Sequence, residues 1–151
     1  MADLKFRIKA QRASDAKTVV KARNFEIIVD EPESLGGTDV APNPVEYVLA
    51  ALAGCLNVTG CLVAKEMGFE IKDLQIDICG DLNPARLFGQ TETERAGYNN
   101  LEVKMTPICD ADEATLNEWL SKVESRCPVS DNLMNATPLN IGFKFSRAKA
   151  A

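Results

Sequence analysis

The sequence predicts a single α+β domain over residues 1–151, with mainly antiparallel sheets around one long buried helix. Several short segments alternate apolar and polar residues with a period of two, which is typical of half-buried strands. Residues 47–64 are instead apolar on nearly every side, as in a fully buried helix. The strands also follow one another along the chain, which favours antiparallel pairing over a doubly wound parallel sheet.

The amino-terminal part is predicted to hold three strands. They are the alternating run Leu4, Phe6, Ile8 and Ala10 and the segments 17–22 and 25–30, the last two joined at Arg23 and Asn24. Residues 32–44 contain Gly36, Gly37 and three prolines, and are therefore expected to form a loop.

The long helix has a clear predicted start. Asn43 can cap it, Pro44 suits its first position, and Glu46 stands three residues after the cap, as in a capping box. A membrane span would need about 20 strongly apolar residues, whereas this stretch of 18 is interrupted by four small or polar residues. We therefore expect no membrane contact. A single domain of this size has too few other residues to cover such a helix on every side, so we predict an intimate homodimer.

The remaining elements are two strands, a second helix and a last strand. The strands centre on Ile76 and Val103, with an irregular connection over residues 81–100. Asp110 is predicted to cap the second helix, with Glu113 completing a capping box. Its apolar stripe comprises Leu116, Trp119, Leu120 and Val123, and Cys127 continues it. Pro128 is expected to end the helix, Ser130 to cap a short turn through Asn135, and residues 139–145 to form the last alternating strand.

Composition excludes several classes of function. The sequence has no histidine, so no catalytic triad, Cys–His pair or His-containing zinc site can form within it. The net charge is −5 and no long Lys/Arg run occurs, which disfavours nucleic-acid binding. The first residues lack a secretory apolar stretch, so a cytoplasmic location is expected. No cofactor and no metal is predicted.

Five cysteines remain as candidates for chemistry: Cys55, Cys61, Cys79, Cys109 and Cys127. No CxxC pair occurs, which disfavours a structural zinc or iron–sulfur site. A lone cysteine is most often a small buried apolar residue, and Cys61, Cys79 and Cys109 are interpreted in that way. Cys127 differs, because a thiolate near the start of the turn at Ser130 would be stabilised by free N–H groups.

Two motifs together resemble a known family. The stretch Asn43-Pro44-Val45-Glu46 through Ala53-Gly54-Cys55-Leu56, preceded by Gly36-Gly37, and the later Arg126-Cys127-Pro128-Val129-Ser130 are similar to the osmotically inducible protein C and organic hydroperoxide resistance (OsmC/Ohr) family. The resemblance implies an intertwined α+β homodimer with central helices buried between subunits. It also implies a thiol peroxidase that reduces organic hydroperoxides, an antioxidant enzyme of the oxidative stress response.

The resemblance assigns roles to both cysteines. Cys55 would be the peroxidatic thiolate and would become a sulfenic acid. Cys127 would resolve it as a Cys55–Cys127 disulfide, and an external dithiol would restore the thiols. Since burial raises the pKa of a thiol, a cation must stand nearby.

The family uses an arginine oriented by a glutamate to supply that charge. Glu46 matches the glutamate, although Val45 separates it from Pro44, and on a straight helix Glu46 faces away from Cys55. It would serve the other subunit's site or simply cap the helix. Arg12 is slightly favoured as the arginine, with Arg23 and Arg126 as alternatives.

Two other hypotheses stay open. One is a non-peroxidatic relative that binds a small apolar or thiol-containing ligand in the dimer cleft. It is supported by the glutamate and the arginine, whose positions in this sequence do not match those of the peroxidases in the family. In that case the thiol of Cys55 would titrate near or above its free value of about 8.5. The other is a structural dimer in which every cysteine belongs to the core.

Overall fold

The structure is a computed structural model, which describes residues 2–146. Its strands are β1 (Lys9–Arg12), β2 (Thr18–Ala22), β3 (Phe25–Val29), β4 (Asp73–Asp81) and β5 (Asn100–Ile108). Its helices are the short 3₁₀ turn η1 (Glu33–Leu35) and α1 (Pro44–Glu66), α2 (Glu113–Arg126) and α3 (Pro128–Met134). Strands β1, β2 and β3 form one antiparallel sheet, and β4 pairs with β5 in a second.

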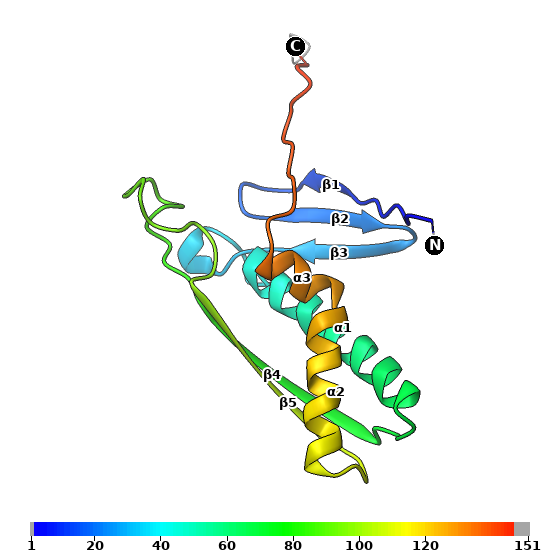
Figure 1. Ribbon diagram of the computed structural model, residues 1–151. Coiled ribbons are helices and arrows are strands. Elements are labelled where there is room, and N and C mark those ends of the chain that lie inside the picture. The colour runs from blue at the N-terminus through cyan, green and yellow to red at the C-terminus, as the bar shows by residue number, and fades with distance from the viewer. Residues whose placement is uncertain (1, 147–151) are drawn as a thin grey trace.

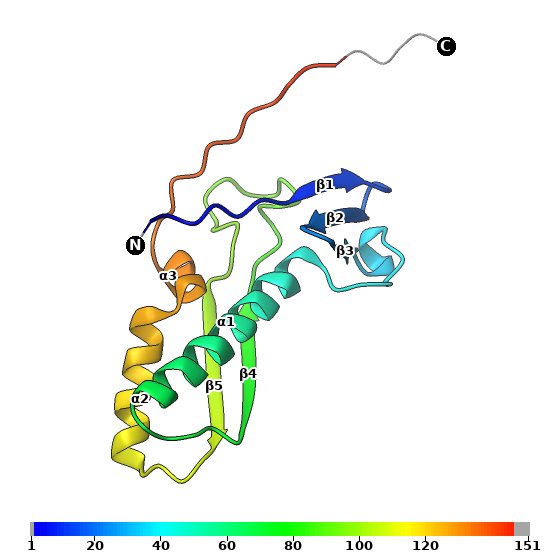
Figure 2. The same cartoon turned by 90° about the vertical axis from the view of Figure 1, so that its right-hand side faces the viewer.

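The two sheets lie at different ends of the long helix. Figure 2 shows the β1–β3 sheet beyond the amino-terminal end of α1, while α1 and α2 cross over one face of the β4–β5 hairpin. The predicted α+β class with antiparallel pairing and a long central helix is confirmed. The core sits where α1, α2 and β4 meet, around Leu56, Val63, Trp119 and Val123.

Helix α1 begins as predicted. The Asn43 side chain accepts a hydrogen bond from the Glu46 amide at 2.9 Å, and the Glu46 carboxylate accepts one from the Asn43 amide at 2.8 Å. This capping box satisfies two amides that the first helical turn leaves free. The helix has 23 residues, so by length and composition alone it could cross a membrane, yet it packs on α2 and β4. Only a third of its most apolar stretch is buried within the chain.

Both predicted terminal strands differ from the structure. Strand β1 covers only Lys9–Arg12, and Leu4, Phe6 and Ile8 before it are exposed. The predicted strand at residues 139–145 does not form in the described chain; the segment runs away from the body (Figure 1), and Phe143 is 93% exposed. A strand needs a neighbour for its backbone hydrogen bonds, and the described chain offers this segment none.

The starts of α2 and α3 also differ from expectation. Asp112, not Asp110, caps α2, and its carboxylate accepts from the Thr115 amide at 2.8 Å. Asp110 instead pairs with Lys72 at 2.9 Å. Pro128 ends α2 as predicted, but it also begins α3, two residues before the expected turn at Ser130.

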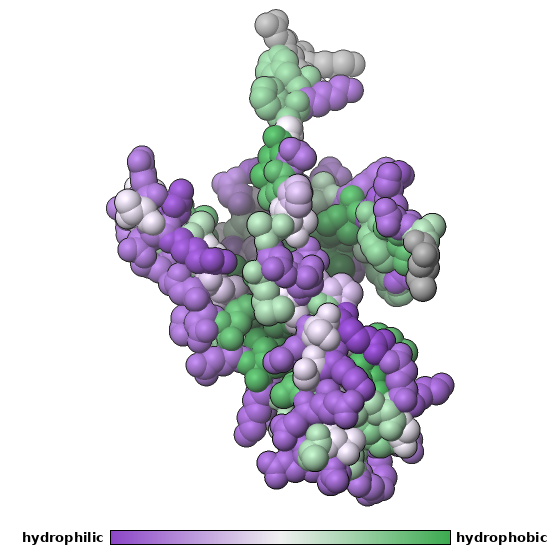
Figure 3. All heavy atoms as spheres, viewed as in Figure 1, coloured by the Kyte–Doolittle hydropathy of each residue, from purple (hydrophilic) through white to green (hydrophobic). Residues whose placement is uncertain are grey.

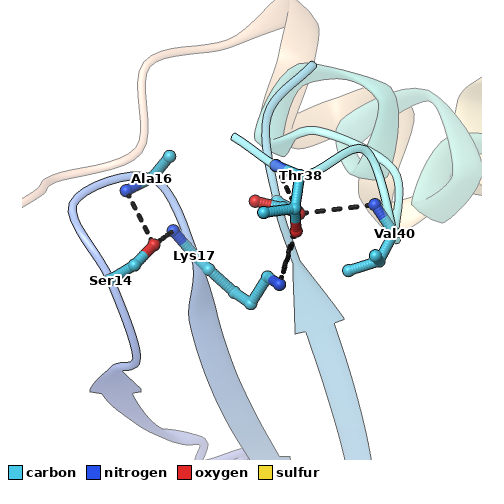
Figure 4. Close-up of polar contacts among 6 residues, drawn as sticks. Ser14, Ala16, Lys17, Thr38 and Val40 are labelled. Carbon is cyan, nitrogen blue, oxygen red and sulfur yellow. Dashed lines mark hydrogen bonds and ion pairs between the residues drawn. The ribbon is translucent and has the colours of Figure 1, made fainter. Parts of the chain in front are cut away.

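A buried carboxylate fixes the loop before α1. Asp30 is fully buried, and its Oδ2 atom accepts hydrogen bonds from the Thr38 hydroxyl at 2.6 Å and from the amides of Thr38 and Val40. Lys17 lies 3.6 Å from Asp30 and donates to the Thr38 hydroxyl at 2.6 Å. Figure 4 shows Lys17 reaching from the β1–β2 turn to Thr38. The hydrogen bond from Thr38 outweighs burial and holds the pKa of Asp30 well below its usual value.

This cluster predicts an acid-dependent difference between the wild type and Asp30→Asn. A carboxyl whose pKa is depressed in the folded state stabilises the fold above its unfolded pKa of about 3.9 and loses that contribution as pH falls below it. We expect the variant to melt at a lower temperature at pH 7, and the gap to narrow at acidic pH. Thermal unfolding monitored by circular dichroism measures both. A gap that stays constant with pH would show that the charge of Asp30 is irrelevant.

Candidate active site

The structure brings Cys55 and Cys127 together, although 72 residues separate them in the sequence. Cys55 is half-buried in the middle of α1. Cys127 lies at the junction of α2 and α3, where it is 1% exposed and forms part of the core. Both thiols are free, and each shifts the pKa of the other, so the two side chains lie close together. Reduced thiols this close form a pair that can become a disulfide.

The packing of α2 on α1 sets this meeting point. The indole N–H of Trp119 donates to the Gly60 carbonyl of α1 at 2.8 Å in the core. A Cβ at Gly60 would lie 3.0 Å from the Trp119 ring, so the glycine permits this close approach. Val63 and Val123 are fully buried beside it. Cys127 follows Val123 by about one helical turn, which carries it along the same face of α2 to α1.

The surroundings of the two thiols differ. Burial raises the pKa of Cys55, and hydrogen bonds from the Val129 amide and the Thr59 hydroxyl offset it only in part. Burial also opposes ionisation of Cys127, but hydrogen bonds from the side chain and amide of Ser130 and from Cys55 outweigh it and lower its pKa. In the isolated chain Cys127 is therefore the easier of the two thiols to ionise.

Each predicted arginine is engaged elsewhere within the chain. Arg12 pairs with Asp15 on the surface, and the Arg23 guanidinium lies 5.0 Å from the centre of the Phe25 ring. Arg126 forms a two-bond ion pair with Glu66 at the end of α1. None of the groups that shift the pKa of Cys55 in the described chain is a cation.

Glu46 serves as a helix cap in this chain, through the capping box described above. This is one of the two roles expected for it.

The other three cysteines stand apart from the pair. Cys61 and Cys79 are exposed rather than buried as expected, and Cys109 is half-buried. The sequence analysis did not single out Thr59, and it quoted Val129 and Ser130 in the second motif without predicting that either contacts Cys55 or Cys127. Thr59 stands four residues after Cys55, a helical spacing that places it beside the thiol and could have indicated it.

Among the residues that the structure describes, no cluster of acidic residues and cysteines could hold a metal ion. An apolar groove instead lies between α2, α3, α1 and β5. Its volume is about 780 Å³, and its lining includes Leu52, Leu56 and Ser130 but neither Cys55 nor Cys127. Figure 3 shows hydrophobic atoms at the surface between α2 and the β4–β5 hairpin. The surface of this groove suits an apolar molecule.

The chain is similar to a known protein family over most of its length. The model of the OsmC-like protein family matches residues 36–142. The chain is 24% identical over 143 residues to the uncharacterised protein YmaD of Bacillus subtilis (strain 168), covering 93% of this chain and 94% of that protein.

Solved structures share the fold. An OsmC-like protein from Mycoplasma pneumoniae aligns with a TM-score of 0.76 and 21% identity, over 88% of this chain and 89% of that one. An organic hydroperoxide resistance protein OsmC from Legionella pneumophila aligns with a TM-score of 0.63 and 20% identity, over 88% and 91% of the two chains. Because the family model spans well over half of the sequence and includes both cysteines, the chain belongs to the OsmC-like protein family.

Proposed function

We propose that the protein is a cysteine-based peroxidase that reduces organic hydroperoxides, with Cys55 as the nucleophile. The proximity of the thiols of Cys55 and Cys127 carries the proposal. Membership of the OsmC-like family and the fold shared with organic hydroperoxide resistance proteins from Legionella pneumophila and Elizabethkingia anophelis support a peroxide-related role.

The reaction balances with the residues present. The Cys55 thiolate attacks one oxygen of the hydroperoxide, the O–O bond breaks, and the alkoxide leaves and takes up a proton as the alcohol. Cys55 is thereby oxidised to a sulfenic acid. The sulfur of Cys127 then attacks the sulfur of Cys55, the S–O bond breaks, and water leaves as the disulfide forms. A cytoplasmic dithiol returns both residues to thiols by exchange and is itself oxidised to a disulfide.

Ionisation of Cys55 requires a cation, and none of the described residues places one beside it. We propose that a second copy of the chain supplies it and that the protein is a homodimer. Arg12 and Arg23 belong to the first sheet, outside the core of α1 and α2, and either can serve this role across an interface.

Exposed apolar side chains support the dimer. Seven of them lie in the two terminal segments and are 66–93% exposed: Leu4, Phe6, Ile8, Leu139, Ile141, Phe143 and Phe145. Val58 and Leu62 on α1 are also more than half exposed. Exposed apolar side chains in this number are typical of an interface, and an unpaired alternating strand is a template for pairing with another chain.

The test is consumption of tert-butyl hydroperoxide by the reduced protein with a dithiol as reductant. We expect the wild type to turn over and Cys55→Ser to lose essentially all of the activity, because no other thiol can form the sulfenic acid next to Cys127. Cys61→Ser removes an exposed thiol from the same helix and is expected to keep full activity. Equal rates for the wild type and Cys55→Ser would refute the proposal.

One observation favours a second candidate function, binding without peroxide chemistry. Burial raises the pKa of Cys55 in the single chain, as expected of a protein that only holds an apolar or thiol-containing ligand. Titration of Cys55 by its rate of alkylation distinguishes the two functions. A pKa well below about 8.5 in the assembled protein indicates the peroxidase, and a pKa at or above that value indicates the binding protein.

A further inference from the structure

The first sheet concentrates positive charge on one side. An open hollow of about 610 Å³ lies over β1, the β2–β3 turn and the chain before β1, and six residues line it. Five of the six are cations, which we call the basic face: Lys5, Arg7, Lys9, Lys21 and Arg23. All five are exposed, and none forms an ion pair among the described residues.

Strand pairing brings these charges together from separate segments. The chain before β1 continues in line with that strand (Figure 2), so its alternate residues point to the same side. The register of β1 with β2 then places Lys9 directly opposite Lys21. Glu26 stands opposite Lys21 on β3, but it lines an adjoining hollow and not this one. Like charges directly opposite each other destabilise a sheet, so a bound anion would relieve a repulsion that the chain leaves in place.

The proposed homodimer leaves the basic face open. The three apolar residues before β1 that a second copy would cover alternate with three of the cations, which therefore point to the other side. The remainder of the molecule has the opposite charge: without these five residues the net charge of −5 becomes −10. An anionic partner is thus attracted at this face and repelled elsewhere, which fixes the orientation in which it approaches.

The residues of the basic face indicate what kind of anion it meets. A protein interface has an apolar centre that is poor in lysine, whereas this hollow contains three lysines and a single apolar residue, Ile8. Single-stranded nucleic acid binds to aromatic side chains on which its bases stack, and none lines the hollow. All five cations are exposed, so no buried donor is fixed in place to coordinate one small anion. A cluster of about four to eight lysines and arginines beside a membrane is instead sufficient to attract anionic lipid headgroups.

We propose that the basic face docks the protein on the surface of an anionic phospholipid membrane, with the lysines and arginines on the lipid phosphates and no segment inserted. The inference goes beyond the proposed peroxidase function and does not depend on it. The expectation of no membrane contact was drawn from the length and composition of α1 and concerned a membrane span. Helix α1 takes no part in the docking proposed here.

The experiment measures how much of the full-length protein sediments with lipid vesicles. One set contains phosphatidylcholine and phosphatidylglycerol in equal parts, and the other contains phosphatidylcholine alone. We expect the protein to bind the first set at low salt and not the second, because only phosphatidylglycerol carries a net negative charge. Added salt should release it, since the charges lie on the surface and are screened.

The variant Lys5→Glu with Lys9→Glu tests the face itself. Each lysine near an anionic surface contributes about fivefold to binding, so reversing two of them should weaken binding by about tenfold or more. A glutamate at position 9 faces Lys21 and turns a repulsive pair into an attractive one, which favours the sheet. Thermal unfolding should therefore show a fold at least as stable as the wild type. Arg23 is left unchanged, because it is a candidate for the cation beside Cys55.

Lys65→Glu with Arg95→Glu is the matched control. Both residues are exposed, lie outside the hollow and form no ion pair among the described residues. The control changes the net charge by the same amount as the test variant and should bind the anionic vesicles nearly as well as the wild type.

The other outcomes would overturn the inference. Failure of the wild type to bind anionic vesicles at low salt, or equal binding to both sets, would exclude attraction by lipid charge. An equal loss in the control would assign binding to the net charge instead of this face. Tighter binding of a DNA oligonucleotide, lost in the test variant, would make the partner a nucleic acid. Saturable binding of inorganic tripolyphosphate that displaces the vesicles would make it a small anion.

Discussion

Replacing Cys127 with serine is expected to stop turnover and to trap the reaction after its first step. In the wild type, Cys127 lies close to Cys55 and is the thiol placed to attack its sulfenic acid. The serine hydroxyl cannot form that bond. Moreover, Cys127 raises the pKa of Cys55 by its hydrogen bond and its charge, so its removal favours the Cys55 thiolate. The first attack should therefore proceed at least as fast as in the wild type.

Two measurements separate these steps. Steady-state consumption of hydroperoxide with a dithiol should fall by about tenfold or more in Cys127→Ser. Intact-mass spectrometry after one equivalent of peroxide should show a single added oxygen, which a sulfenic acid reagent captures. The double variant, which also carries Cys55→Ser, should show no added oxygen. Wild-type turnover in Cys127→Ser would mean that Cys127 does not resolve the intermediate.

Patterns within the sequence predicted the elements whose stability is local. The capping box at Asn43 and Glu46 formed as expected, because its partners stand three residues apart and need nothing from the rest of the chain. Strands β2 and β3 likewise end within one residue of the predicted bounds. The cap of α2 was placed wrongly. Asp110 has the glutamate of a capping box three residues later, but Asp112 is the cap in the structure and Asp110 pairs with Lys72 instead.

Such patterns did not predict the contacts between residues that lie far apart in the sequence. The meeting of Cys55 and Cys127 depends on how α2 crosses α1, which Gly60 and Trp119 determine across 59 residues. It was expected from the resemblance, not from spacing. Arg126 forms an ion pair with Glu66, 60 residues away, and is therefore not a free charge. No pattern in the sequence indicated this pair. The two terminal strands were predicted only from the alternation of apolar and polar residues. That pattern does not show whether the strand that pairs with each of them belongs to the same chain.

Disrupting the proposed dimer is expected to abolish the peroxidase activity, even when no residue of the candidate active site is changed. Phe143 is 93% exposed and makes no contribution to the core, so Phe143→Asp should leave the single chain folded. If this side chain is buried against a second copy, an aspartate there would be an unpaired buried charge, which is strongly unfavourable. We expect the mass measured by light scattering to fall by half, and the pKa of Cys55 to rise as the second copy and its cation leave.

Asn140→Asp is the control, because it adds the same charge to the same segment on the other side of the alternation. It should remain dimeric and active. The alkylation rate of Cys55 as a function of pH reports its ionisation in each variant, and hydroperoxide consumption at pH 7 reports the consequence. A Phe143→Asp monomer that keeps the wild-type rate would show that a single chain ionises Cys55 by itself. A wild type that is already monomeric and active would remove the second copy from the mechanism, and the charge that stabilises the Cys55 thiolate would then have to come from within one chain.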